Sequence, residues 1–295
     1  MSAALAHQVA EDAVLFDCAG ETLVGIVSRP PAQSDCGLVI VVGGPQYRAG
    51  SHRQFVTLAR ALAIAGHAVL RFDYRGMGDS SGDRRDFSDV SEDIGAAIDA
   101  LQRAVPSLHR IVLCGLCDAA SAALLYCDQT HDTRVTGLML LNPWVRSEAT
   151  LARTHVKHYY GRRLTELDFW IKLATGKVAL TALGGLLKTL KSATSGARQD
   201  PVDRRFQARM ASGWNGFGGN ILLILSGDDY TAKEFVEYAS VDSAWKRALA
   251  HPRLLRKELD GADHTLSDRS KAQVVEQWSC DWLSAHSRFE SAGLG

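Results

Sequence analysis

The stretch Arg110-Ile-Val-Leu-Cys-Gly-Leu-Cys-Asp-Ala-Ala-Ser121 decides the predicted fold. An apolar run ends at a Cys-Gly-Leu-Cys turn, and small, helix-forming residues follow it. This order predicts a buried strand, a sharp turn and a helix, the arrangement that presents the serine of a G-x-S-x-G sequence. Cysteine, at Cys117, stands where that serine would be. The turn needs small neighbours because strand and helix nearly touch there, and Gly115, Ala119 and Ala120 meet that need.

Cys117 is therefore a candidate nucleophile. A helix N-terminus favours a thiolate through its dipole and its free backbone N–H groups. Two other interpretations compete. Free cysteines are often ordinary core residues, as we expect for Cys114, Cys127 and Cys280. Cys114-Gly-Leu-Cys117 is also a C-x-x-C sequence, which elsewhere indicates a redox pair, although Cys114 falls on the inward end of the strand.

Composition bounds the class of protein. The 295 residues are 46% hydrophobic, enough for one large α/β domain or one domain with an insertion. The 33 basic and 33 acidic residues balance, so no nucleic-acid partner is expected. Six cysteines without framework spacing favour a reducing compartment. No basic signal region and no apolar run of about 20 residues is present, so we expect a cytoplasmic protein.

Apolar strands alternate with amphipathic helices along the chain. This alternation predicts an α/β fold with a mostly parallel eight-stranded sheet and helices on both faces. The expected strands are residues 13–18, 22–28, 37–42, 68–72, 111–114, 135–141, 221–225 and 254–259. The expected helices are residues 52–65, 87–105, the segment after residue 117, and 270–284.

The segments that follow the last two strands supply partners for Cys117. In sheets of this type the nucleophile, the acid and the base come in that order, each on a loop after a strand. Ser226-Gly-Asp-Asp229 and Asp260-Gly-Ala-Asp-His264 stand at those two places. His264 is the predicted general base, and His52 is the competitor for that role.

A carboxylate should hold the base in one tautomer and orientation. Asp229, which heads the predicted loop Asp-Tyr-Thr-Ala-Lys-Glu, is the first choice, and Asp228 is the second. Asp260 and Asp263 flank the histidine and are expected to be turn formers that shape its loop.

The oxyanion hole needs two N–H donors. The residue after the nucleophile, Asp118, should supply one backbone N–H, and the loop after residue 42 should supply the other. Pro45 has no N–H, so Gly44 and Gln46 remain, and the side-chain amide of Gln46 could add a donor. The carboxylate of Asp118 is a complication, since a like charge beside the sulfur disfavours the thiolate. Its capping of the helix would reduce that penalty.

Four separated motifs together resemble the α/β-hydrolase superfamily and, more narrowly, the hydrolase 1 group associated with the exosortase A system. They are Gly43-Gly-Pro-Gln-Tyr-Arg-Ala-Gly-Ser-His-Arg53, Asp73-Tyr-Arg-Gly-Met-Gly-Asp-Ser80, Gly115-Leu-Cys-Asp-Ala-Ala-Ser121 and Gly261-Ala-Asp-His264. The resemblance implies a bacterial, cytoplasmic protein linked to exopolysaccharide production or surface-protein sorting. Cysteine for serine, and Ala119 for the second elbow glycine, are similar to dienelactone hydrolases.

Residues 143–212 interrupt the sheet pattern and are predicted to form a helical cap, with helices at 151–159, 166–175 and 177–191. Residues 1–142 and 213–295 would then form the core. The segment holds thirteen Lys and Arg against five Asp and Glu. It is interpreted either as a lid for an anionic acyl carrier, such as a coenzyme A or carrier-protein thioester, or as a peripheral membrane contact. A cap with a solvated basic face is the alternative.

The functional hypothesis is hydrolysis of an ester or thioester of a small acyl substrate through an acyl-thioester intermediate. Acyl transfer by the same residues is the second hypothesis, and a non-catalytic assembly factor is the third. Neither a metal nor a cofactor is expected. The side chains predicted to line the substrate pocket are Tyr47, Arg48, Trp144 and Trp170.

Overall fold

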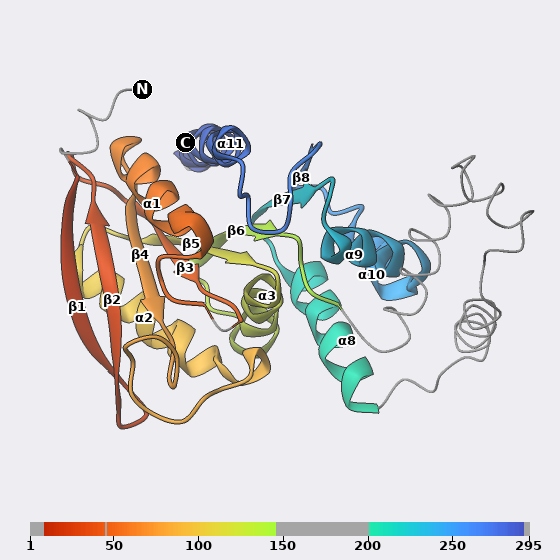
Figure 1. Cartoon of the computed structure of the whole chain (residues 1–295), viewed down its shortest axis with the longest axis horizontal. Coiled ribbons are helices and arrows are strands. Elements are labelled where there is room, and N and C mark those ends of the chain that lie inside the picture. The colour runs from red at the N-terminus through yellow and green to blue at the C-terminus, as the bar shows by residue number, and fades with distance from the viewer. Residues whose placement is uncertain (1–8, 45, 146–200, 292–295) are drawn as a thin grey trace, which may run out of the picture.

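The computed structural model describes residues 9–44, 46–145 and 201–291 (Figure 1). Its sheet has eight strands in the order β1-β2-β4-β3-β5-β6-β7-β8. Strand β2 pairs antiparallel with β1 and β4, and all other pairings are parallel. The predicted mostly parallel eight-stranded sheet is confirmed. The strands are β1 (Ala10–Cys18), β2 (Glu21–Arg29), β3 (Cys36–Val41), β4 (Ala68–Asp73), β5 (Arg110–Leu116), β6 (Val135–Leu141), β7 (Asn220–Ser226) and β8 (Leu254–Leu259).

Helices cover both faces of the sheet. Helices α1 (Gln54–Ile64) and α11 (Arg269–Ser291) lie on one face (Figure 1). The opposite face carries α2 (Ser91–Ala104), α3 (Asp118–Thr130), α8 (Pro201–Gly216), α9 (Tyr230–Val241) and α10 (Ser243–Ala248). None of the helices in the described ranges combines the length and apolar character that a membrane-spanning segment requires.

The central strands are buried on both faces, which explains their continuous apolar runs. All six residues of β3 are buried. Val39 and Val41 pack into the core on the α2–α3 face, while Leu38 and Ile40 pack into the core on the α1–α11 face. Because successive side chains of a strand point to opposite faces, a strand between two helical layers has no polar face to show.

Helices α8, α9 and α10 were not expected from the sequence. The segment after Asp229, expected to be a loop, forms α9 instead, and α10 follows it. Asp229 caps α9 by accepting a hydrogen bond from the Thr231 N–H. Phe235 of α9 then packs against Trp214 and Trp245, with ring centroids 6.2 and 5.3 Å away. The cap and this aromatic cluster outweigh the weak helix propensity of the first turn.

Helix α8 runs across residue 212, the predicted end of the cap. Met210 on one side of that position and Trp214 on the other are both fully buried in the core of the α2–α3 face. This helix therefore packs on the sheet domain on both sides of the expected boundary. The three cap helices predicted before it lie outside the described residues.

Strand β5 and helix α3 come into contact at Gly115. A Cβ built on Gly115 would lie 2.4 Å from the Ala119 carbonyl carbon and 2.5 Å from the Ala120 nitrogen. The chain can make so sharp a turn only with φ 62° and ψ −124° at Cys117, a left-handed conformation that costs about 1–3 kcal/mol for a non-glycine residue. The small residues predicted around the turn are thus required by contact.

Replacing Gly115 by alanine should destabilise the protein by about 1–3 kcal/mol, because the new methyl group would overlap the backbone of α3. The matched control is Gly95→Ala in α2, where the nearest contact of the new Cβ would be the Tyr126 hydroxyl at 3.7 Å. That change should be neutral or stabilise by about 0.5–1 kcal/mol. Denaturant unfolding of both variants measures the difference, and equal stabilities would contradict the contact argument.

Candidate active site

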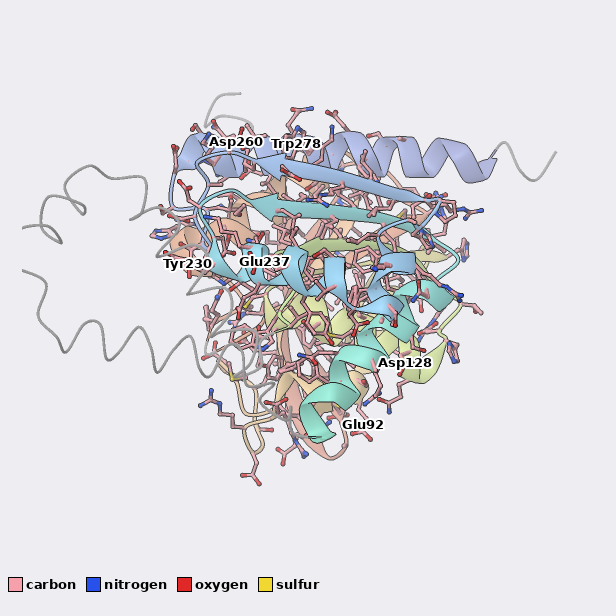
Figure 2. The ribbon with its side chains drawn as sticks, turned by 90° about the vertical axis from the view of Figure 1, so that its right-hand side faces the viewer. Glu92, Asp128, Tyr230, Glu237, Asp260 and Trp278 are labelled. Atoms are coloured by element: carbon pink, nitrogen blue, oxygen red, sulfur yellow. The ribbon has the colours of Figure 1, made fainter. Side chains whose placement is uncertain are left out.

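The predicted site residues lie where the parallel strands end. Cys117 follows β5, Asp229 follows β7 and His264 follows β8. Figure 2 labels Tyr230 and Asp260, the residues just beyond the ends of β7 and β8, and both lie at the same edge of the sheet. The loops after neighbouring strands therefore meet there, as the fold requires of a site at the carboxyl ends.

The Cys117 sulfur stands at the tip of the turn and is partly exposed. The backbone of Cys117 is held on both sides: its N–H donates to the Leu141 carbonyl at 2.9 Å, and its carbonyl accepts from the Ala120 N–H at 3.1 Å. Cys114, by contrast, is buried, and burial raises the pKa of its thiol to about 12. All six cysteines are free thiols. The two cysteines of the C-x-x-C sequence therefore have different environments and form no disulfide.

His264 bridges an acid and the sulfur. Its Nδ1 lies 2.7 Å from Oδ2 of Asp229, and interaction with Cys117 adds to the effect of that carboxylate in raising the pKa of the imidazole. The other oxygen of Asp229, Oδ1, accepts from the Thr231 N–H at 2.9 Å. Asp229 thus holds the imidazole of His264 between the first turn of α9 and Cys117, whose interaction also raises the pKa of His264.

Asp228 and His52, the alternatives for the acid and the base, lie elsewhere. The Asp228 side chain is exposed, and its backbone N–H donates to the Ala262 carbonyl. His52 is exposed in the short 3-10 turn η2 (Ser51–Arg53). Asp263 has the turn-forming role expected of it, since its Oδ1 accepts from the Thr265 and Ser267 N–H groups. That turn holds the loop on which His264 stands.

The hydrogen bond to Asp229 and then that to Cys117 raise the pKa of His264 to about 10, against the opposing effect of burial. The imidazole is therefore protonated at neutral pH in this arrangement. With Nδ1 donating to the carboxylate, the other ring nitrogen is left to face the sulfur. A cation in that position stabilises a thiolate, the reactive form of cysteine.

The donors predicted for the oxyanion hole are engaged by a side chain of the protein. The Gly44 N–H donates to Oδ2 of Asp118 at 2.8 Å. Burial raises the pKa of this carboxyl group, while the backbone N–H groups of Gly44, Ala119 and Asp118 lower it. The Asp118 side chain, in the first turn of α3, thus reaches across to the loop after β3. Gln46, the other candidate donor, has an Oε1 atom that is buried and accepts no hydrogen bond from the described residues.

Arg48 and Tyr47, predicted to line a substrate pocket, belong to a network that fixes the loop after β3. The buried Arg48 guanidinium is paired with Asp73 and, at 2.8 Å, with Asp79. The Arg48 N–H also donates to Asp73 at 2.7 Å, and the Tyr47 hydroxyl lies 3.0 Å from Asp79. A Cβ on Gly78 would lie 2.2 Å from the Asp73 carboxylate, so the glycine-rich loop that follows β4 packs closely around this acid.

Trp144 adjoins the elbow through its backbone, because its N–H donates to the Cys117 carbonyl at 3.2 Å. Trp170 lies outside the described residues. Among the residues that the structure describes, no cluster of three or more His, Cys, Asp or Glu side chains is placed to hold a metal ion.

Sequence reasoning missed a cavity of about 330 Å³ beside Asp118. The loop that follows β4 supplies most of its wall, including two adjacent arginines that could have drawn attention to it. The lining residues are Gly44, Tyr74, Arg84, Arg85, Asp86, Phe87 and Asp118.

Solved structures share this fold over nearly their whole length. An esterase from Pyrococcus furiosus matches with a TM-score of 0.64 and 16% identity, covering 94% of this chain and 92% of that one. Est1E from Butyrivibrio proteoclasticus, solved with ferulic acid bound, matches with a TM-score of 0.62 and 15% identity, covering 92% and 98%. Dienelactone hydrolase from Anabaena variabilis matches with a TM-score of 0.60 and 14% identity, covering 95% and 99%. The search of curated protein sequences returned no match.

The fold and the order of the site residues define an α/β hydrolase. The family model described as serine aminopeptidase S33 matches residues 33–200, more than half of the 295 residues. The chain belongs to this family of esterase-like hydrolases.

The raised pKa of His264 predicts a pH-dependent contribution of Asp229 to stability. That contribution should be fully present below about pH 6.5, the ordinary pKa of histidine, and should be lost as pH rises through about 10. Asp229→Asn keeps an oxygen to accept from Thr231 but removes the charge that stabilises the imidazolium. The melting temperature of this variant should fall below that of the wild type at pH 6, and the deficit should shrink toward pH 10. A deficit of constant size across this range would contradict the assignment.

Proposed function

We propose that the protein hydrolyses an ester or thioester through nucleophilic attack by Cys117. The observation that carries the proposal is the 2.7 Å contact between His264 Nδ1 and Asp229, together with the upward effect of Cys117 on the pKa of the same imidazole. Nucleophile, base and orienting acid within hydrogen-bond reach of one another are the recognised signature of covalent catalysis. The structural neighbours include an esterase and a dienelactone hydrolase, which supports an acyl substrate.

The proposed reaction has two steps. The Cys117 sulfur attacks the carbonyl carbon of the substrate, a C–S bond forms, and the bond to the leaving alkoxide or thiolate breaks. His264 gives its proton to that leaving group. Water then attacks the acyl thioester while His264 takes a proton from it, and cleavage of the C–S bond releases the acid and restores the thiolate. The histidine ends as the imidazolium with which it began.

Both tetrahedral intermediates carry a negative oxygen that needs donors. The backbone N–H groups of Gly44 and Asp118 are the proposed pair, one from each side of the elbow. The Gly44 N–H donates to the Asp118 carboxylate, with Oδ2 2.8 Å away. The Asp118 side chain therefore has to move before the Gly44 N–H can donate to a substrate.

The biological setting that we propose comes from the sequence motifs. Their resemblance to the exosortase A system-associated hydrolase 1 group supports a cytoplasmic role in exopolysaccharide production or surface-protein sorting. Coenzyme A and carrier-protein thioesters are the proposed acyl donors, because the segment at 143–212 has thirteen basic residues against five acidic ones. The same charge supports peripheral contact with an anionic membrane.

Iodoacetamide should alkylate Cys117 in preference to the other cysteines. Cys280 is the matched control because it is also partly exposed, but burial raises the pKa of its thiol to about 11. Cys117→Ala should abolish the fast labelling at pH 7 and Cys280→Ala should leave it unchanged, as measured by peptide mass spectrometry. Uniform labelling of the partly exposed thiols would rule out an activated Cys117.

His264→Ala should lower the rate of p-nitrophenyl ester hydrolysis about 10²-fold or more, the usual effect of losing a general base. His52→Ala is the control and should retain the wild-type rate. Mass spectrometry of Cys117 peptides from protein isolated from its native cell would identify a trapped acyl group. A wild-type protein that is alkylated at Cys117 but turns over no ester or thioester would instead support the assembly-factor hypothesis.

A further inference from the structure

The carboxylate of Asp118 occupies the place that a substrate oxygen needs. Its Oδ2 is 2.8 Å from the Gly44 nitrogen and accepts a hydrogen bond from that N–H. The Gly44 N–H is one of the two donors assigned above to the oxyanion. Since a donor directed at one oxygen cannot at the same time serve a second one at full strength, the carboxylate and a substrate carbonyl compete for the same position.

The loop after β3 is shaped around this carboxylate. A Cβ on Gly43 would lie 1.9 Å from Oδ1 of Asp118 and 2.8 Å from the Ala119 nitrogen. Any residue other than glycine at position 43 would therefore displace the side chain or the helix. Burial raises the pKa of Asp118, while the hydrogen bonds from Gly44 and Ala119 lower it, and Asp86 adds a further upward effect. The Asp118 carboxyl group is thus largely buried and packs closely against the loop after β3.

Asp118 also borders a cavity with room for its carboxylate. The side chain lines the 330 Å³ cavity that Tyr74, Arg84 and Arg85 also line. Neither arginine forms an ion pair with any residue in the described ranges. Asp86, the other acid of the cavity wall, caps the turn η3 (Phe87–Asp89) by accepting from the Ser88 N–H. A carboxylate that leaves Gly44 for this cavity meets two cations there.

We propose that Asp118 gates the oxyanion hole: its carboxylate blocks the hole while bonded to Gly44 and opens it by turning toward Arg84 and Arg85. This gate rests on the proposed role of Cys117 as the nucleophile. It makes acylation of Cys117, which needs the oxyanion hole, slower than the reactivity of the sulfur alone would allow. Alkylation of the sulfur by iodoacetamide passes through no oxyanion and is not gated.

The test compares two rates in the same buffer at pH 7. One is the burst of p-nitrophenol from p-nitrophenyl acetate, which reports acylation, and the other is alkylation by iodoacetamide. Removal of the charge beside the sulfur changes the thiolate fraction, and that change enters both rates, so their ratio reports the gate alone. Asp118→Ala should raise the ratio of acylation to alkylation about tenfold or more. Asp118→Ser, which keeps a side-chain acceptor for the helix N-terminus, should act in the same direction if the alanine variant folds poorly.

Variants of Arg84 and Arg85 provide a second test of the gate. Arg84→Ala with Arg85→Ala should lower the ratio in the wild-type background, because the open position loses its counter-charges. The same pair of changes should have no effect in the Asp118→Ala background, where no carboxylate has to be held. A loss of equal size in both backgrounds would overturn the gate and assign the arginines to substrate binding.

Two further outcomes separate the gate from the proposed function. An unchanged or lowered ratio in both Asp118 variants, with fast alkylation intact, would overturn the gate and leave Cys117 as the nucleophile. Loss of the acylation burst in Cys117→Ala is expected if Cys117 is the nucleophile. A burst that persists in Cys117→Ala would overturn the assignment of Cys117 as the nucleophile. The proposed gate, which depends on that assignment, would then be overturned as well.

Discussion

The contact between Gly115 on β5 and the first turn of α3 is the constraint on which the site depends. With the Gly115 Cα this close to the backbone of Ala119, the chain reverses direction within one residue, and that residue, Cys117, takes a left-handed conformation. The reversal places the sulfur at the edge of the sheet and turns the N-terminus of α3 toward the loop after β3. Nucleophile position, helix dipole and backbone donors thus all follow from one close approach.

The fold was largely predictable because its signals are local. The run 36–41 is apolar throughout, as a strand buried on both faces must be, and the residue types around Cys117 reveal the turn. The order of Cys117, Asp229 and His264 was also readable, because each follows a strand. What brings them together is the parallel sheet, which aligns the ends of β5, β7 and β8 at one edge.

The remaining features depend on contacts between distant segments, which no local pattern encodes. Asp229 was expected at the head of a loop, but the packing of Phe235 against Trp214 makes its segment a helix. The pairing of Arg48 with Asp73, at the end of β4, could not be read from the sequence either. The direction of the Asp118 side chain depends on the loop at Gly43 and Gly44, some 74 residues earlier in the chain. The sequence places a carboxylate next to the nucleophile, but it does not predict the direction of that side chain.

The two oxygens of Asp229 have separate hydrogen-bond partners, and together these two bonds fix the orientation of the carboxylate. One oxygen is held by the first turn of α9 and the other by His264, so the carboxylate plane cannot rotate without breaking one of the two hydrogen bonds. The orientation of the His264 imidazole is therefore set by α9, which packs through Phe235 into the aromatic cluster with Trp214 and Trp245. The entropy of aligning base and nucleophile is lost once, when the chain folds, and does not have to be supplied again by each substrate that binds.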